Sequence, residues 1–357
     1  MRLCFAPMDW ITNCATRLIT QQIFDKYREN EDELILWTEF MNVDWFLINP
    51  NQVIKHAITI KWQKPILQIY GWKEESLLKA CEKIQNEYSQ IFSWLELNTG
   101  CPSNTVMKVW WWSDMLKDKD RTLNIIKKLS KLCTSLPFSL KTRAWLNEDD
   151  KVKQIDFLVK ASEFCSKISI HWRTLKQLYS WWADWNFISE TKREIKKSWN
   201  SNCEVIWNGW ITSYHEARMK IDEFNLDGIM IGQSAIWNPR IFTAHEPSIE
   251  EKYESILNHL NYSIACDQRF EEKIANKSES ISIEDVEIPF DWIRERSKEY
   301  ENKSDFYPHT VIEFRKFLFQ YVKWIPWSKE RKQNILSCKN YIELKDQILY
   351  LFEWMIK

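Results

Sequence analysis

One thiol stands beside turn-forming residues in the segment from Ser93 to Met115. An apolar run from Trp94 to Leu97 ends at Asn98, and Cys101 follows in a loop with Thr, Gly and Pro. Asn98 offers a donor and an acceptor to a planar heterocycle, and a loop thiol with a reference pKa of about 8.5 can donate a proton. Free cysteine is usually a small buried hydrophobe, so Cys101 is a candidate proton donor only because of its neighbours.

Eight short apolar runs have the length and composition of buried strands, and charged segments suited to helices lie between most of them. This alternation, over roughly 250 residues, predicts an α/β fold of the (β/α)8 TIM-barrel type, with an open doubly wound sheet as the alternative. The runs are Leu3 to Ala6, Leu34 to Trp37, Ile66 to Tyr70, Trp94 to Leu97, Phe138 to Lys141, Lys167 to His171, Glu204 to Ile206 and Gly228 to Ile231. The helical segments include Glu74 to Tyr88, Asp120 to Leu132, Lys151 to Phe164 and Tyr214 to Phe224.

Polar residues gather where these runs end, which is where a barrel places its active site. Taken singly, each has a structural explanation, because a lone histidine is usually a satisfied structural residue and a lysine usually lies in solvent. Their coincidence at eight ends favours a functional site. They are Pro7, Met8, Asp9, Glu39, Gln68, Asn98, Cys101, Lys141, Arg143, His171, Arg173, Asn208, Gly209, Gly232 and Gln233.

The alternation of strand-like and helical segments ends after Phe242, and no further strand is expected. Helical spacing at 250–270, 309–321 and 329–356 predicts a helical domain at 246–357 after a barrel domain at 1–245, with a charged, loop-like stretch at 271–304. Basic residues surround aromatic ones between 313 and 332. That pattern suits a solvated helix face or a surface that contacts a phosphate backbone.

The net charge and the cysteine content limit the class of protein. The 357 residues carry a formal net charge of −1, so any nucleic-acid surface must be local. Nine cysteines without paired CxxC spacing argue against a zinc ribbon or a disulfide framework, and no metal site is expected. We expect a cytoplasmic protein without a signal peptide or a membrane anchor.

Several motifs in this order resemble the tRNA-dihydrouridine synthases, which combine a flavin-binding barrel with a helical domain. The combination is specific, although each motif alone is weak. The motifs are APMDWITN at 6–13, LWTEFM at 36–41, ELNTGCPSNTVMK at 96–108, SLKTRAW at 139–145, IHWRT at 170–174, IWNGWI at 206–211, GIMIGQSAIWNP at 228–239 and KWIPW at 323–327.

This resemblance implies that FMN and NADPH are used to reduce the 5,6 double bond of a uridine in tRNA. Cys101 would protonate carbon 5 as general acid, and Asn98, Arg143 and Arg173 would contact the substrate. Lys141, with His171 close by, would stabilise charge on the reduced flavin. Pro7, Met8, Asp9 and Gln68 would line the flavin ring, and Asn208, Gly209, Trp210, Gly232 and Gln233 would hold its phosphate.

Other functions stay open. An FMN barrel acting on a free pyrimidine would need the phosphate site but not the helical domain, and a non-catalytic tRNA-binding protein would not need Cys101. Gln233 stands where the resemblance leads us to expect arginine, so one phosphate contact is in doubt. We expect a monomer.

The chain holds 22 Trp and 5 Gly, although glycine usually makes up about 7% of a protein. Tryptophan stands at many positions where the family pattern has glycine, and an indole cannot replace glycine where φ is positive or where a phosphate approaches the backbone. We hypothesise that UGA codons, read as glycine in some bacteria, are written here as tryptophan. The positions are Trp10, Trp45, Trp94, Trp110, Trp111, Trp112, Trp145, Trp172, Trp181, Trp207, Trp237, Trp324 and Trp327, with Trp72, Trp182 and Trp210.

Overall fold

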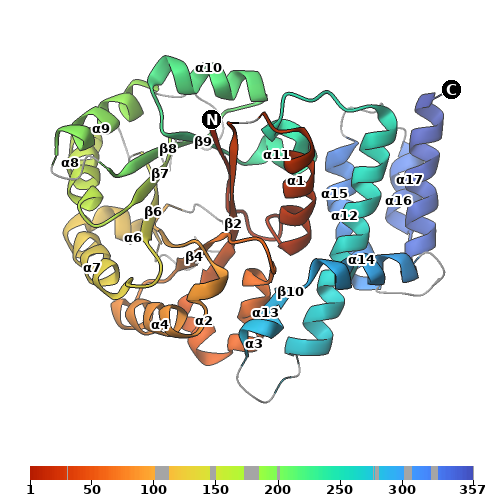
Figure 1. Ribbon diagram of the computed structural model, residues 1–357, viewed down its shortest axis with the longest axis horizontal. Helices are drawn as coiled ribbons and strands as arrows, with labels where there is room; N and C mark the ends of the chain where they lie inside the picture. Colours follow the sequence, from red (N-terminus) through yellow and green to blue (C-terminus); the bar gives the residue numbers. More distant parts are fainter. Residues whose placement is uncertain are drawn as a thin grey trace.

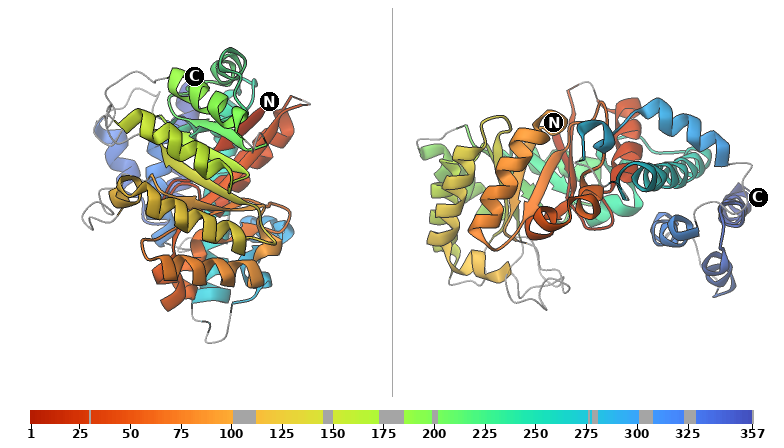
Figure 2. Two further views of the ribbon diagram at one scale, coloured as in Figure 1. Left: turned by 90° about the vertical axis from the view of Figure 1, so that its left-hand side faces the viewer. Right: turned by 90° about the horizontal axis from the view of Figure 1, so that it is seen from below.

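The computed structural model contains a closed barrel of eight parallel strands with a second group of helices beside it (Figure 1). The structure describes residues 1–29, 31–100, 112–144, 150–172, 185–198, 202–275, 277, 281–300, 308–322 and 329–356. Helices surround the barrel, and the C-terminal helices lie to one side of it, as Figure 1 and the right-hand view of Figure 2 show.

The eight predicted runs are all strands of the barrel, which confirms the predicted fold class. Each strand pairs in parallel with the next, and the last pairs with the first. Strands buried on both faces read as near-continuous apolar runs, which is why the sequence reveals them. The strands are β1 Arg2–Phe5, β2 Glu33–Asn42, β4 Ile66–Tyr70, β5 Trp94–Asn98, β6 Phe138–Arg143, β7 Lys167–His171, β8 Glu204–Asn208 and β9 Gly228–Ile231.

The surrounding helices follow from amphipathic segments with recognisable caps. The side chains of Asn13, Asp118 and Ser213 each accept a backbone N–H at the start of a helix, which satisfies an otherwise unpaired donor. The elements are α1 Cys14–Tyr27, α2 Val43–Ile48, α3 Pro50–Val53, η1 Ile54–Ala57, α4 Glu74–Glu87, η2 Ser89–Ile91, α6 Trp112–Lys117, α7 Lys119–Leu132, α8 Lys151–Ser162, α9 Trp185–Lys197, α10 Tyr214–Phe224, α11 Gln233–Trp237 and η4 Pro239–Phe242.

The C-terminal part is helical, as predicted. Its long first helix begins with a capping box, in which Ser248 and Glu251 each accept the other's backbone N–H. The elements are α12 Ile249–Phe270, η5 Glu271–Ala275, α13 Ile283–Val286, β10 Glu287–Ile288, α14 Phe290–Glu299, α15 Pro308–Tyr321, α16 Lys329–Ser337 and α17 Tyr341–Ile356. No helix among the described residues has the length and apolar character needed to cross a bilayer.

The expectation of a loop from 271 to 304, without further strands, was wrong. This stretch contains α13, α14 and β10, and β10 pairs in parallel with β3 (Thr59–Ile60). A few apolar side chains lie among its charged residues and are fully buried against the rest of the chain, including Val286, Ile288 and Ile293. A two-residue strand is too short to give a periodic signal.

The barrel and the C-terminal helices meet where α1 packs against α12. The buried imidazole of His259 lies at this junction and contacts Thr16 Oγ1 through Nε2 at 3.1 Å and Tyr321 Oη through Nδ1 at 2.9 Å. One side chain therefore connects α1, α12 and α15.

Candidate active site

Four polar side chains lie close together at the carboxyl ends of β4, β5, β6 and β8. Asn98 Nδ2 donates to Gln68 Oε1 at 2.9 Å, and Lys141 Nζ donates to Asn208 Oδ1 at 3.0 Å. Asn98 and Lys141 are register partners on adjacent strands, so the two pairs are neighbours. Gln68, Asn98 and Asn208 are almost fully buried. Three amide groups and one ammonium group are thus joined in one polar group.

A buried carboxylate supports this group from within the barrel. Glu96 Oε1 accepts hydrogen bonds from Gln68 Nε2 at 2.6 Å and from Trp37 Nε1 at 2.8 Å. Glu96 is fully buried, and burial raises its pKa to about 7, although the contact with Gln68 and the charge of Lys141 oppose that shift. Below it, Trp37 fills an apolar layer inside the barrel with Cys4, Ile66 and neighbouring residues.

The loop after β5 is fixed against β6 up to Gly100. Gly100 N donates to Asn98 Oδ1 at 3.0 Å, and Gly100 O accepts from Arg143 Nε at 2.6 Å. A Cβ at Gly100 would lie 2.8 Å from Arg143 N, so this close approach requires glycine. The predicted acid Cys101 and the predicted substrate residue Arg173 lie outside the described residues, as does the KWIPW segment.

The residues predicted to hold a phosphate follow β8 and β9. His171 and Asn208 are register partners, and Gly209 follows with a φ of 127°. A Cβ on Gly209 would overlap the buried indole of Trp172, so that indole fills the space beside Gly209. Gly232 and Gln233 begin α11, and Gln233 is exposed. This end of the site is therefore partly filled by tryptophan.

The loop after β1 contributes Pro7, Met8 and Asp9. Met8 Sδ lies 3.6 Å from the place that a Cβ on Gly232 would take, so the loops after β1 and β9 are adjacent at the barrel mouth. Pro7 is buried, whereas Asp9 is exposed at the loop's edge.

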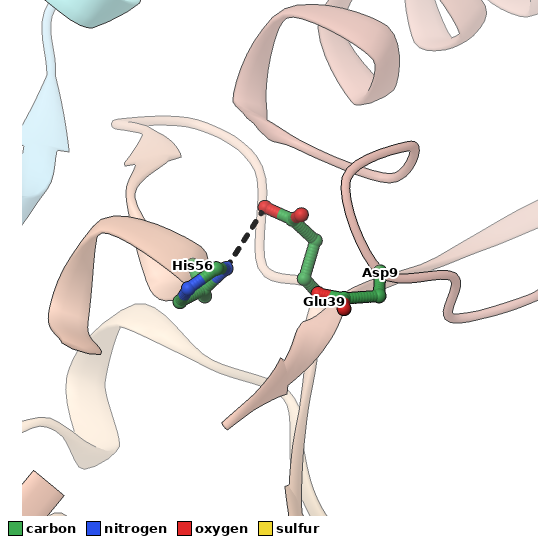
Figure 3. Close-up of side chains that lie close together, drawn as sticks. All are labelled: Asp9, Glu39 and His56. Carbon is green, nitrogen blue, oxygen red and sulfur yellow. Dashed lines mark ion pairs between the residues drawn. The ribbon is translucent and has the colours of Figure 1, made fainter. Parts of the chain in front are cut away.

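Asp9 approaches Glu39 and His56, two groups without a role predicted from the sequence (Figure 3). Their potential ligand atoms lie within 4.8 Å of one another. Glu39 accepts from the backbone N–H of Trp10 at 2.6 Å and pairs with His56 Nδ1 at 3.5 Å. Partial desolvation of the Asp9 carboxyl and the charge of Glu39 raise the pKa of Asp9. These contacts hold the loop after β1 against η1.

A cavity of about 560 Å³ lies between this cluster and the C-terminal helices. The described residues that line it do not include Gln68, Asn98, Lys141 or Asn208. Barrel and helical residues share its wall: Trp10, Glu39, Lys55 and His56 face Asp267, Phe270, Phe314 and Lys316. It is a space between the barrel and the C-terminal helices, beside the barrel mouth.

Two tryptophans near the mouth have backbone conformations that favour glycine. Trp10 has a φ of 60° and Trp210 a φ of 51°, and among the described residues other than glycine only Asn225 shares a positive φ. Their indoles are 53% and 51% exposed, so burial of the side chains does not account for the strained backbone. Of the other tryptophans at expected glycine positions, 110, 111, 145, 181, 182, 324 and 327 lie outside the described residues.

Sequence reasoning missed Glu96 as part of the site. The sequence did contain a signal for Glu96, because it is a carboxylate in an otherwise apolar buried strand. It lies two residues before Asn98, so it must face the same side of the strand as Asn98. Glu39 was placed at the end of its run without a role, and the contact of Glu39 with His56 depends on tertiary structure.

The family model for dihydrouridine synthase (Dus) matches residues 4–311. Similar proteins include a "Probable tRNA-dihydrouridine synthase" of Rickettsia conorii, 31% identical over 218 residues that cover 56% of this chain and 62% of the relative. The protein of the same name from Rickettsia bellii is 28% identical, with coverages of 54% and 60%. "tRNA-dihydrouridine synthase B" of Pasteurella multocida is 29% identical, with coverages of 54% and 59%.

The chain thus spans about three fifths of the length of these curated relatives. The family model, by contrast, runs from β1 through the barrel and into α15. It includes every strand that contributes to the polar group at the barrel mouth. This chain belongs to the dihydrouridine synthase family.

Proposed function

We propose that this protein is a tRNA-dihydrouridine synthase, which uses NADPH and FMN to reduce the 5,6 double bond of uridines in tRNA. Family membership supports the proposal, and a relative from Coprinopsis cinerea is named "tRNA-dihydrouridine(47) synthase [NAD(P)(+)]". The observation that carries it is the joined group of Gln68, Asn98, Lys141 and Asn208 at the barrel mouth.

The residues at the mouth fit the ring system of FMN. The pyrimidine edge of a flavin alternates acceptors and a donor, which amide side chains such as Gln68 can match. Lys141 places a positive charge where the reduced ring carries negative charge, and His171 ends the adjacent strand β7. These residues would hold the flavin ring, and a bound FMN reduced by NADPH would supply the hydride for carbon 6 of the uridine.

The chain's own residues would do the rest. Asn98 would hold the uracil edge, and Cys101 would give its proton to carbon 5 on the face opposite the hydride. Arg143 and Arg173 would contact the substrate. The anchored residues Thr99 and Gly100 lead directly to Cys101, because Thr99 N donates to Lys141 O at 2.8 Å and Gly100 bonds to Asn98.

The phosphate end does not fit FMN as the chain is written, because the indole of Trp172 fills the space beside Gly209. We infer that Trp10, Trp172 and Trp210 stand for glycine in the organism's own protein, through UGA codons that it reads as glycine. The positive φ of Trp10 and Trp210 supports this inference, since glycine takes such angles without strain. The codons at 110–112 test it: UGA is expected, and UGG would contradict it, as would a native peptide whose mass contains tryptophan.

The helical domain at 246–357 is proposed to contact tRNA. Lys329 and Lys332 are exposed on α16, in the segment that combines basic and aromatic residues. Contacts of lysine and arginine with phosphates weaken steeply with salt. We further propose that the protein works as a cytoplasmic monomer.

The experiment is to purify the protein, record its visible spectrum, and incubate it with NADPH and unmodified tRNA. A bound flavin spectrum together with dihydrouridine in the tRNA is expected. A flavin spectrum with reduction of free uracil and no change in the tRNA would favour a free-pyrimidine enzyme instead.

A further inference from the structure

The amide groups of Gln68 and Asn98 form a chain whose direction is set at both ends, by Glu96 inside the barrel and by the backbone N–H of Gly100 at the loop. A carboxamide can present either its oxygen or its NH2 group to a neighbour, so an amide pair alone has two nearly equivalent orientations. At the buried end, however, Glu96 Oε1 receives hydrogen bonds from both Trp37 Nε1 and Gln68 Nε2. An indole nitrogen only donates, so the oxygen that it faces must accept.

This acceptor and the backbone N–H of Gly100, which can only donate, together determine the direction of the chain. Gln68 must turn its NH2 group to Glu96, which leaves Gln68 Oε1 to accept from Asn98 Nδ2. Asn98 then presents Oδ1, and that oxygen accepts the backbone N–H of Gly100. If Asn98 were reversed, its NH2 group would oppose the N–H of Gly100, and the contact would be lost.

The second carboxyl oxygen of Glu96 is buried and has no hydrogen-bond partner among the described residues. Because Oε1 already faces two N–H donors, a proton taken up by this carboxyl would reside on Oε2. The oxygen that faces Gln68 would accept in either protonation state, so the direction of the chain would not change near neutral pH, where Glu96 titrates.

We propose that Glu96 is a positioning residue, which fixes the orientation of Gln68 and Asn98 and thereby holds the loop that leads to Cys101. This inference rests on the proposed function, because it gives Asn98 and Cys101 their roles toward uracil. Glu96 itself touches neither reactant. The alternative is a merely structural role, in which Glu96 only satisfies Trp37 and stabilises the barrel interior.

Three variants separate these roles. Glu96→Gln keeps an acceptor oxygen for the two donors and should rescue the orientation. Glu96→Met keeps a similar volume but removes the acceptor. Trp37→Phe removes one hydrogen bond to the same oxygen while leaving Gln68 paired with Glu96, so it is the matched control for a loss of stability. Each variant is first checked for folding by thermal unfolding.

The main measurement is the rate at which iodoacetamide alkylates Cys101 in the flavin-free protein, read by mass spectrometry of its peptide. In Glu96→Met we expect this rate to rise by about fivefold or more and kcat to fall by about tenfold, because Gln68 loses its buried acceptor and holds Asn98, the acceptor of the Gly100 N–H, less rigidly. Glu96→Gln should stay within about threefold of the parent in both, and Trp37→Phe should lower the melting temperature without changing the alkylation rate.

Equal alkylation rates in Glu96→Met and the parent would overturn the proposal, as would an equal increase in Trp37→Phe. If Glu96→Met does not fold while Glu96→Gln folds and behaves like the parent, Glu96→Ala takes the place of Glu96→Met in the same alkylation assay. The alkylation readout needs no turnover. If the parent makes no dihydrouridine but the variants differ as expected, the proposed function fails while the positioning role stands.

Discussion

Lys141 on β6 donates a hydrogen bond to Asn208 on β8, with 3.0 Å between Nζ and Oδ1, and this contact crosses the intervening strand β7. The ammonium group is thereby fixed over the barrel mouth rather than extended into solvent. It is the cationic group that the proposed flavin site would use to balance negative charge on the reduced ring.

Replacing Lys141 by alanine should therefore weaken FMN binding by about tenfold, or about 1.4 kcal/mol. The measurement is a titration with FMN, followed by flavin fluorescence, of flavin-free protein that carries Trp10→Gly, Trp172→Gly and Trp210→Gly. Lys167→Ala is the matched control, because Lys167 is a buried lysine at the start of β7 that pairs with Glu204. It should lower the melting temperature but leave FMN affinity unchanged. Equal FMN affinity in Lys141→Ala and the parent would remove Lys141 from the flavin site.

Replacing Cys101 by alanine should abolish turnover while FMN binding stays intact. A general acid usually contributes about 10²–10⁴-fold to a rate, so dihydrouridine formation should fall by at least about 10²-fold. The assay is single-turnover oxidation of the reduced enzyme by tRNA, which isolates the step after flavin reduction. A rate within about tenfold of the parent would show that another group supplies the proton.

Replacing Trp10 and Trp210 by glycine should stabilise the chain as written. A left-handed backbone costs a residue other than glycine roughly 1–2 kcal/mol, which exceeds the roughly 0.5–1 kcal/mol of extra entropy that glycine loses on folding. We expect each change to raise the free energy of unfolding by about 0.5–1 kcal/mol in urea titrations.

Trp62→Gly is the control for this pair, because Trp62 is 47% exposed and does not share the positive φ of Trp10 and Trp210. Without relief of strain, this change should lower the free energy of unfolding by about 0.5–1 kcal/mol. If all three changes destabilise the protein alike, the inference that these tryptophans occupy glycine positions loses its structural support.

The junction between barrel and helices should weaken in mild acid because of His259. Burial lowers the pKa of His259 to about 3, below its value of about 6.5 in the unfolded chain. The unfolded state then binds the proton first, so this stability is complete above about pH 6.5 and is lost as the pH falls toward 3.

Between pH 7 and pH 5 the loss should be about 2 kcal/mol. The measurement compares urea unfolding of the parent and of His259→Gln across this range. The variant should be less stable at pH 7 but should lack this part of the pH dependence. Parallel curves for the two proteins would assign the acid sensitivity to other groups.

Most of the barrel could be predicted because its strands are buried on both faces. The runs at Ile66–Tyr70, Lys167–His171 and Gly228–Ile231 match the observed strands end to end. The stretch from 271 to 304 could not be predicted, because its few buried side chains are separated by charged ones and its strand β10 exists only through pairing with β3.

The site, too, could be predicted only in part. The polar residues at strand ends were predictable, because parallel strands bring their carboxyl ends to one face. The direction of the amide chain was not, since it depends on Glu96 contacting both Trp37 and Gln68 from different strands. The filling of the space beside Gly209 by Trp172 likewise requires coordinates.

The proposed reduction of uridines in tRNA is best tested on the product nucleosides themselves. The purified protein is incubated with FMN, NADPH and tRNA from a strain that lacks dihydrouridine, and the nucleosides are analysed by mass spectrometry. The proposed function predicts a uridine carrying two additional hydrogens, formed only when NADPH is present. Unchanged tRNA in the presence of a flavin-loaded enzyme that consumes NADPH would contradict it.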